Sequence, residues 1–215
     1  EYKDVVIDNN GKATVPNVLV IGNNTVVAVY DGDINYTSSR NYTNFTVAKD
    51  PALVNVTATT VVYGNDSVIT VKVPVAQTGY VRIIVDGTSI NVTAEIINGE
   101  AKFNATGLSV GRYLVNVTYL GDKLHSTEKN STYFDITKAN LTASGIGLNV
   151  TVKEDGGIVI TVPSDFDGKV KVDVNGVKYD GDVKALINID KFEAGSYTAN
   201  VTFYNSKNYN DKSID

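Results

Sequence analysis

The sequence predicts an all-β protein in which antiparallel β-sandwich domains follow one another along an extended rod. Two observations carry this prediction. Apolar residues alternate with polar ones, and the alternating stretch at residues 111–119 returns at residues 195–203 and, less clearly, at residues 22–30. A period of two with one apolar face is typical of a β-strand that covers a core. Three copies of one strand indicate three copies of one structural unit.

The alternation also predicts which side chains of the repeated strand face the core. Successive side chains of an extended chain point to opposite sides, so every second residue lies on the same face. The residues predicted to face inward are Tyr113, Val115, Val117 and Tyr119 in one copy and Tyr197, Ala199, Val201 and Phe203 in the other. Asn116 and Asn200 fall on the outer face.

The repeat has a long period. Phe45 matches Phe134, 89 positions later, whereas the shift has fallen to 84 between Gly111 and Gly195. A period of this length with many short strands favours an array of independent β-domains over a thin-repeat solenoid.

We expect three units. Residues 1–50 read as the C-terminal half of a β-sandwich domain, residues 51–138 as a complete domain, and residues 139–215 as one that lacks its last strand. Strands are expected at residues 2–8, 45–47, 53–60, 68–73, 81–85, 90–97, 101–105, 113–119, 133–137, 148–152, 158–162, 170–174, 178–180, 184–189 and 197–204. Roughly seven short strands in about 88 residues are typical of a β-sandwich. The short links at residues 48–51 and 137–140 favour the rod.

The composition excludes several classes of partner and site. The formal net charge is -5 and the two signs are scattered, which argues against nucleic acid and anionic membranes as partners. No apolar run approaches the roughly 20 residues of a membrane-spanning helix, so we expect no membrane insertion. Without Cys there is no disulfide and no thiolate metal site. The chain also has no Met, from which we expect a segment of a longer protein.

Two short motifs resemble a feature of a known fold. Residues 108–113 (Leu-Ser-Val-Gly-Arg-Tyr) and 192–197 (Phe-Glu-Ala-Gly-Ser-Tyr) are similar to the tyrosine corner before strand F of immunoglobulin-like domains. That resemblance implies tandem immunoglobulin-like sandwiches. The Trp and the Cys pair of antibody domains are absent, so an antibody-like role is unsupported.

The whole chain resembles the immunoglobulin-like repeats of adhesin-like surface proteins of methanogenic archaea. Their pattern Gly-x-Tyr-x-x-x-Val-x-Tyr is followed by Gly-Asp-x-x-Tyr and a closing Phe-x-Val strand, which residues 30–36, 119–125 and 204–209 follow in part. Asn24 replaces the corner Tyr in the first unit, and Asn205-Ser206 replaces Gly-Asp in the third. The resemblance implies an extracellular location at a cell surface.

Asn-x-Ser/Thr sequons are the most frequent local motif. They lie at Asn23, Asn35, Asn41, Asn44, Asn55, Asn65, Asn91, Asn104, Asn116, Asn130, Asn140, Asn149 and Asn200. Chance would give only roughly four in a chain of this composition, so we expect several to carry glycans. The alternative is that Asn-Val-Thr is the ordinary polar face of a strand. Asn35, Asn41, Asn65 and Asn130, expected in turns or loops, are the favoured acceptors.

No constellation of residues indicates a reaction. His125 is the only histidine and stands in register with Tyr36 and Tyr209, which favours an aromatic residue packed in a loop. The acidic turns at residues 31–33, 165–167 and 180–182 could bind calcium, but Asp and Gly are also ordinary turn residues. We therefore expect no enzyme activity, cofactor or metal site. An intramolecular Lys–Asn cross-link stays open.

The tyrosines divide into two predicted groups. The alternation places Tyr30, Tyr113, Tyr119 and Tyr197 in the core. Tyr36, Tyr42, Tyr80 and Tyr209 are expected to be more exposed. Exposed Tyr often serves recognition, although loop packing explains such residues more simply.

These features favour a structural stalk segment of a glycosylated, adhesin-like cell-surface protein. Its partners would be neighbouring immunoglobulin-like domains. One alternative is a module that binds host or cell-wall glycans or a host protein. Another is a filament subunit that assembles by strand complementation between chains.

Overall fold

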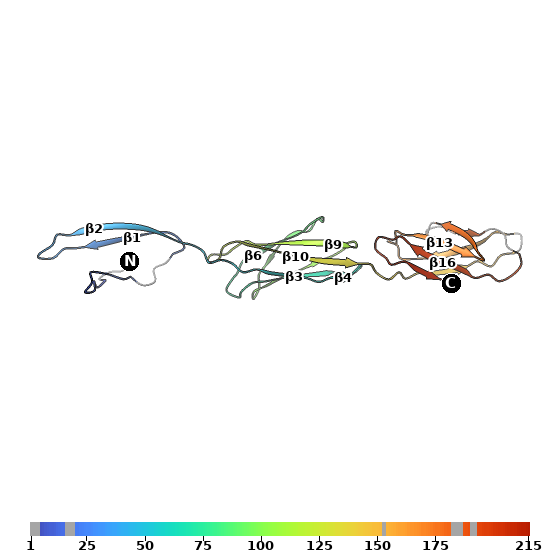
Figure 1. Ribbon diagram of the computed structural model, residues 1–215, viewed down its shortest axis with the longest axis horizontal. Helices are drawn as coiled ribbons and strands as arrows, with labels where there is room; N and C mark the ends of the chain where they lie inside the picture. Colours follow the sequence, from blue (N-terminus) through green and yellow to red (C-terminus); the bar gives the residue numbers. More distant parts are fainter. Residues whose placement is uncertain (1–4, 16–19, 152–153, 182–186, 190–192) are drawn as a thin grey trace.

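The computed structural model describes residues 5–15, 20–151, 154–181, 187–189 and 193–215. These residues form β-strands and irregular segments, with no helix among them. Three groups of strands follow one another along the longest axis of the molecule (Figure 1). The strands β3–β10 form what we call the second sandwich, and β11–β17 the third; the domain boundaries at residues 50/51 and 138/139 stay predictions.

The second sandwich consists of two sheets. The first has the order β3-β5-β8 and the second β4-β10-β9-β6-β7. Their strands are β3 (Asn55–Ala58), β4 (Val61–Val62), β5 (Ser67–Lys72), β6 (Tyr80–Val85), β7 (Asn91–Glu95), β8 (Glu100–Ala105), β9 (Gly111–Tyr119) and β10 (Glu128–Thr137). All pairs are antiparallel except β4 with β10, which is parallel.

The core of the second sandwich lies between these sheets because alternate residues of each strand point inward. Val115, Val117 and Tyr119 of β9 are buried, as the alternation predicts, and share one core with Ile83 of the neighbouring strand β6 and Ile69 of the opposite sheet. The strand order corresponds to strands A-B-E and G-F-C of immunoglobulin-like domains. The predicted all-β sandwich fold is confirmed.

The third sandwich repeats this arrangement. Its sheets have the orders β11-β12-β15 and β14-β13-β16-β17. The strands are β11 (Ser144–Gly147), β12 (Gly156–Thr161), β13 (Lys169–Val174), β14 (Val177–Gly181), β15 (Ile187–Ile189), β16 (Ala199–Tyr204) and β17 (Lys212–Ile214). Strands β11, β12 and β13 begin 89 positions after β3, β5 and β6. Val172, Val201 and Phe203 are buried in a separate core.

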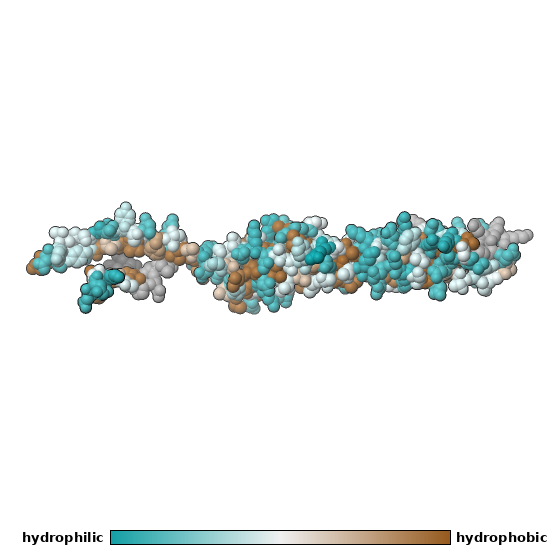
Figure 2. All heavy atoms as spheres, in the orientation of Figure 1, coloured by the Kyte–Doolittle hydropathy of each residue, from teal (hydrophilic) through white to brown (hydrophobic). Residues whose placement is uncertain are grey.

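The first segment contributes one hairpin. β1 (Gly22–Tyr30) pairs with β2 (Ser39–Val47) over nine residues each, in the positions of β9 and β10. Val26, Val27 and Val29 are exposed, and no buried core forms among the described residues of this segment. Figure 2 shows hydrophobic residues on the open surface of the hairpin.

Several predicted strands differ from the observed ones. Residues 5–8 are not a strand, and residues 1–4 of the same prediction lie outside the described residues. The strand expected at 184–189 is present as Ile187–Ile189, its beginning lying outside the described residues. The predicted turn at Asn10-Gly11 forms, with Gly11 at a φ of 74° and its N–H bonded to the Asp8 carbonyl.

The largest differences lie in the third sandwich. The strand predicted at residues 148–152 is absent over the described residues 148–151, and β16 begins at Ala199 instead of Tyr197. β17, whose three residues pair with β16, corresponds to the first residues of β10, whereas the strand expected to be missing is the counterpart of residues 133–137. The absent strand and the late start of β16 have one cause: in the second sandwich the corresponding positions pair with the second half of β10, to which no described strand of the third sandwich corresponds.

Candidate functional site: the junctions between units

The described residues contain no group of three or more His, Cys, Asp or Glu side chains that could hold a metal ion. Instead, the densest polar contacts between segments distant in sequence lie where one unit meets the next. We define the first junction as the link at residues 48–51 with the loop at 120–127, and the second as the link at residues 138–140 with the loop at 205–211.

Both junctions share one backbone contact. The N–H of Asp50 donates to the carbonyl of Leu124 at 2.9 Å, and the N–H of Ser126 donates to the carbonyl of Asp50 at 2.9 Å. At the second junction Ala139 makes the same pair with Asn208 and Asn210, at 3.0 and 2.8 Å. Each link is therefore fastened to the loop between the last two long strands of the unit that follows it.

A lysine precedes the bridging residue in both links. The Nζ atom of Lys49 donates to the carbonyl of Asp122, and the Nζ atom of Lys138 donates to the carbonyl of Ser206, the latter at 2.7 Å. Lys49 and Lys138 are 89 positions apart, so the repeat preserves the contact as well as the fold.

The second junction adds direct contacts between the two sandwiches. The hydroxyl of Tyr63 in the second sandwich donates to Asp165 Oδ2 in the third at 2.8 Å, and the hydroxyl of Tyr209 donates to Asp165 Oδ1 at 2.8 Å. The two tyrosine rings meet edge to face, with centroids 5.5 Å apart. Asn208 Oδ1 also accepts from the N–H of Val110 at 3.0 Å. We call Tyr63, Asp165 and Tyr209 the tyrosine clasp.

The tyrosine clasp shifts the pKa values of Asp165 and Tyr209 in opposite directions. The hydrogen bond from Tyr63, followed by that from Tyr209, holds the pKa of the Asp165 carboxyl below its ordinary value. Burial and then the hydrogen bond to Asp165 raise the pKa of Tyr209 to about 12. Both shifts favour the ionised carboxylate with neutral phenols, which is the state that forms two charge-assisted hydrogen bonds.

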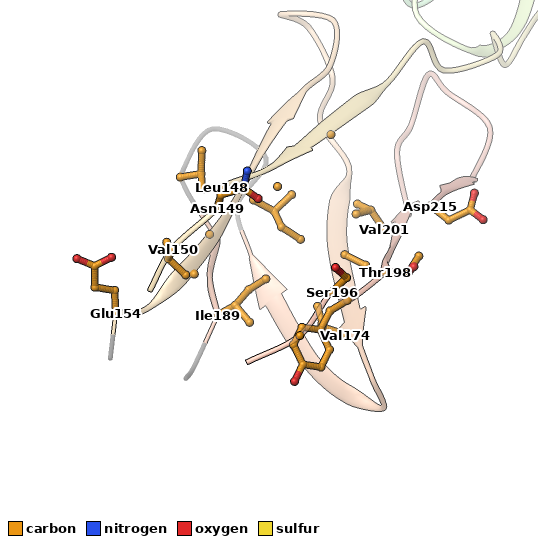
Figure 3. Close-up of a pocket in the computed structure, with 18 of the residues that line it drawn as sticks. Leu148, Asn149, Val150, Glu154, Val174, Ile189, Ser196, Thr198, Val201 and Asp215 are labelled. Atoms are coloured by element: carbon orange, nitrogen blue, oxygen red, sulfur yellow. The ribbon is translucent and has the colours of Figure 1, made fainter. Parts of the chain in front are cut away.

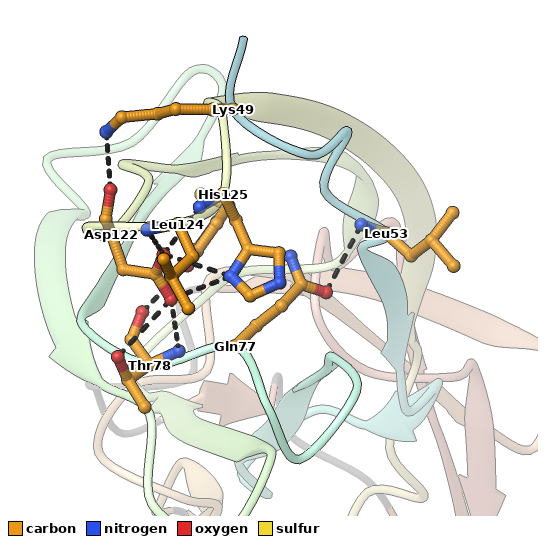
Figure 4. Close-up of polar contacts among 8 residues, drawn as sticks. Lys49, Leu53, Gln77, Thr78, Asp122, Leu124 and His125 are labelled. Carbon is orange, nitrogen blue, oxygen red and sulfur yellow. Dashed lines mark hydrogen bonds and ion pairs between the residues drawn. The ribbon is translucent and has the colours of Figure 1, made fainter. Parts of the chain in front are cut away.

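The first junction lacks the clasp. Ala76 and His125 occupy the positions of Asp165 and Tyr209 in the repeat. His125 packs in the loop, as predicted, with its Nδ1 3.0 Å from Asp122 Oδ1 (Figure 4). The Asp122 carboxylate also accepts from the backbone N–H groups of Leu124 at 2.8 Å and of Thr78 at 2.9 Å.

These donors act strongly on the Asp122 carboxyl. The Thr78 N–H, aided by the donors of His125 and Leu124 and opposed by burial, holds its pKa well below the usual range. Burial in turn raises the pKa of Tyr119, whose hydroxyl donates to the Thr78 carbonyl at 2.9 Å, to about 12. Asp122 thus ties the loop at 120–127 to the loop before β6.

In the third sandwich the same two loops are joined by a carboxylate and a hydroxyl residue, but these two residue types have changed places between the loops. Where the second has Thr78 and Asp122, the third has Asp167 and Ser206 in register. The Ser206 hydroxyl donates to Asp167 Oδ1 at 2.5 Å, and the Lys207 N–H donates to the same oxygen at 3.1 Å. The departure from Gly-Asp at residues 205–206 is therefore compensated by a carboxylate on the opposite loop.

The predicted tyrosine corners are both present. The hydroxyl of Tyr113 donates to the carbonyl of Ser109 at 2.8 Å, and that of Tyr197 to the carbonyl of Glu193 at 2.9 Å. Two tyrosine predictions are wrong. Tyr197, expected in the core, is 42% exposed, whereas Tyr209, expected to be exposed, is only 8% exposed because it enters the clasp.

Four of the other assigned tyrosines lie where the sequence places them. Tyr119 is fully buried, while Tyr36, Tyr42 and Tyr80 are exposed, as predicted. Tyr30 is half-buried at the end of β1.

The acidic turns act as local structure. Asp33 Oδ1 accepts from the N–H groups of Asn35 and Tyr36 at 2.7 and 2.8 Å, as expected of a turn residue. Asp180 lies in β14. Asp182, from the third acidic turn, lies outside the described residues.

Twelve of the thirteen sequon asparagines are exposed, and Asn116 is half-buried. Asn35 and Asn65 lie in turns or loops, whereas Asn41 and Asn130, also expected there, lie in β2 and β10. The Nδ2 atom, to which a glycan would attach, donates to Asp86 Oδ1 in Asn116 (3.0 Å) and to the Val54 carbonyl in Asn130 (2.7 Å). Glycosylation itself stays a prediction.

No protein-family model matches the chain, and no curated protein matches it. Among solved structures it is similar to murine CEACAM1b, with 13% identity, a TM-score of 0.31, and coverage of 76% of this chain and 99% of that one. It is also similar to the FN1–FN3 domains of chicken CNTN1, with 10% identity, a TM-score of 0.28, and coverage of 80% and 70%.

A third similar structure is dimeric latent PorU from Porphyromonas gingivalis, with 12% identity, a TM-score of 0.29, and coverage of 83% of this chain and 22% of that one. Likenesses at these scores carry no argument about function. The fold assignment rests on the strand order and the two cores of this molecule. Within the described residues no helix is long and apolar enough to cross a membrane.

Proposed function

We propose that the chain is a non-catalytic, structural segment of a glycosylated stalk at an archaeal cell surface. In this role sandwiches in series hold a distal part of an adhesin-like protein away from the envelope. The sequence resemblance and the sequons motivate the location and the glycans. The junctions supply the physical basis for the mechanical role.

The tyrosine clasp is the observation that carries the proposal. A stalk needs contacts that oppose bending between neighbouring domains, since a bare link lets them reorient. Tyr63 reaches from the second sandwich to Asp165 in the third, and the edge-to-face contact with Tyr209 adds a second attachment. The Tyr209 hydroxyl holds the Asp165 carboxylate in place within the third sandwich, and the hydrogen bond from the Val110 N–H to Asn208 Oδ1 adds a further contact across the junction.

Small-angle X-ray scattering of the purified chain tests the proposal. A stalk segment gives an elongated distance distribution that stays unchanged with protein concentration. A distribution typical of sandwiches folded back on one another would contradict it. Binding of the isolated chain to a glycan array would instead support the module that binds glycans.

Intact mass measured on protein from the native source tests the glycans. We expect mass increments of whole oligosaccharides on several of the thirteen sequons. A mass equal to that of the bare polypeptide would remove glycosylation from the proposal and leave the mechanical part standing.

A further inference from the structure

The link at the first junction contains a peptide bond of a reactive type. Asp50 is followed there by Pro51, whereas the other three prolines of the chain all follow Val. In the second link the corresponding positions hold Ala139 and Asn140. The repeat therefore preserves the backbone contacts of the link but not this bond.

An Asp-Pro bond combines two features that favour its cleavage. The Asp side chain can close a cyclic anhydride onto the carbonyl carbon of its own residue, so the attack is intramolecular. The Pro nitrogen belongs to a tertiary amide and leaves as a secondary amine. Asp50 and Pro51 are both exposed, and none of the described residues forms a hydrogen bond with the Asp50 carboxyl. The side chain is therefore available for this attack.

The first junction acts directly on the carbonyl group of this bond. The carbonyl oxygen of Asp50 accepts from the Ser126 N–H at 2.9 Å, and the Asp50 N–H donates to the Leu124 carbonyl at 2.9 Å. Attack on the carbonyl carbon places negative charge on its oxygen, and a fixed backbone N–H beside that oxygen stabilises the charge. The two hydrogen bonds also hold the Asp50 backbone in one conformation, which lowers the entropy cost of the attack.

We propose that the Asp50–Pro51 bond is a self-cleavage site, at which the Asp50 side chain separates the first segment from the second sandwich in acid. One oxygen of the protonated carboxyl attacks the Asp50 carbonyl carbon and forms the C–O bond of the anhydride. The carboxyl proton passes to the Pro51 nitrogen as the C–N bond breaks. Water then opens the anhydride. The net reaction is hydrolysis of one peptide bond by one water molecule, with no change of oxidation state.

The other titratable groups at this junction have their own contacts or lie beside the link. Lys49 donates through its Nζ atom to the Asp122 carbonyl, and the Asp122 carboxylate lies 3.0 Å from His125 Nδ1 (Figure 4). Lys123 is the remaining titratable residue of the same loop. Protonation of the Asp50 carboxyl itself, which acid brings about, is therefore the event that starts cleavage.

Cleavage would detach the first segment from the rest of the chain. Apart from the peptide bond, the described residues up to Asp50 reach the second sandwich through the hydrogen bonds of Asp50 and Lys49. The tyrosine clasp that joins the next pair of units is absent from this junction. The inference does not depend on the stalk role, but cleavage would end any mechanical connection at this link.

Intact mass of the whole chain, incubated in acid and at about pH 7, tests the inference. The acid sample is kept at the lowest pH at which the second sandwich stays folded. We expect two fragments, residues 1–50 and 51–215, whose masses sum to that of the chain plus one water. Asp50→Ala copies the second link, and Pro51→Ala turns the bond into a secondary amide. We expect each variant to slow cleavage by more than about tenfold.

A peptide with the sequence of residues 46–55 separates the effect of the junction from the reactivity of the bond alone. It lacks the Ser126 N–H, and we expect the folded chain to be cleaved at least about tenfold faster at the same pH. Hydrogen exchange of residues 111–119 checks that the second sandwich is folded. Global melting would not, because the third sandwich has its own core and an open groove of about 780 Å³ beside Leu148 and Val150 (Figure 3).

Three results would overturn the inference. One is a folded chain that stays intact in acid after the peptide has been cleaved. Another is cleavage between residues 50 and 51 at an unchanged rate in Asp50→Ala. The last is an equal rate in the folded chain and in the peptide, which would remove the junction from the reaction.

Discussion

The two junctions place the same loops together but use different side chains to hold them. At the first, Asp122 on the loop after β9 collects donors from its own loop and from Thr78. At the second, that carboxylate has moved to Asp167 on the opposite loop, and Asp165 beside it reaches Tyr63 of the preceding sandwich. The contact between the two loops of one unit therefore forms whichever of the loops carries the carboxylate. The tie between units needs an additional acidic residue and a tyrosine on each side.

The largest expected effect concerns β10, which the second sandwich has in full and the third only in its first residues. Phe134→Ala removes a buried ring, and we expect the second sandwich to lose about 3–5 kcal/mol of unfolding free energy while the third is unaffected. Unfolding followed by hydrogen exchange in each sandwich measures this. Tyr133→Ala, at a 54% exposed neighbour on the same strand, is the control and should cost far less. Equal losses from both variants would contradict this role of Phe134.

The next effect is the pH dependence of the contacts that the Asp122 carboxylate makes. Because folding lowers the pKa of Asp122, its ionised form stabilises the second sandwich above the unfolded pKa of about 3.9, and this stabilisation is lost as the pH falls through the folded value. Melting temperatures between about pH 2 and pH 7 should therefore fall with acidification.

The variant Asp122→Asn gives the control for this dependence. It keeps the shape of the side chain but cannot ionise, so its melting temperature should be lower at pH 7 and depend less on pH. The same slope in the variant and the natural chain would assign the acid sensitivity to other carboxylates.

A smaller effect is expected from changing the tyrosine clasp, which restricts the relative orientation of the second and third sandwiches more than it stabilises either of them. Tyr63→Phe removes one hydrogen bond to Asp165 and keeps the ring. We expect a broader distance distribution across the second junction, with little change in melting temperature. Since the chain has no Cys, spin labels on Lys102→Cys and Lys178→Cys report this junction, and labels on Arg40→Cys and Lys102→Cys report the first. Broadening at both junctions would contradict a local role.

The smallest effects concern the sequons. In Asn116 and Asn130 the Nδ2 atom already donates one hydrogen bond, so a glycan that replaces its other hydrogen must fit beside Asp86 or Val54. We therefore expect lower occupancy at these two than at Asn35, which lies exposed in a loop. Glycopeptide mass spectrometry on the native protein measures occupancy at each site, and equal occupancy would show that these hydrogen bonds do not matter.

The strands with regular alternation could be predicted because the polarity of each residue indicates which face of the strand it lies on. Val115, Val117 and Val201 alternate with polar residues, and all three are buried. Strands that depend on a partner could not be predicted in this way. Residues 148–151 have the composition of a strand but lack the neighbour that Val61 has in β10, so propensity alone gave the wrong answer.

The junctions were harder to predict, because the residues that contact one another there are far apart in the sequence. Tyr63 and Asp165 are far apart in the chain; Tyr63 belongs to no motif, and Asp165 was noted only as part of the acidic turn at residues 165–167. One signal was available: in register, Thr78 and Asp122 become Asp167 and Ser206, a paired exchange of hydroxyl and carboxylate that indicates contact. Tyr209 was misplaced because its loop looks exposed until the preceding sandwich is packed against it.

The parallel pairing of β4 with β10 has a consequence for how the second unit would bear tension. β4 lies near the point where the chain enters the unit, and β10 leads to the point where it leaves. A pull on the two ends would slide these strands past each other along their length, so their hydrogen bonds share the load at the same moment. The hydrogen bonds between β4 and β10 therefore make the second sandwich resist a pull along the chain.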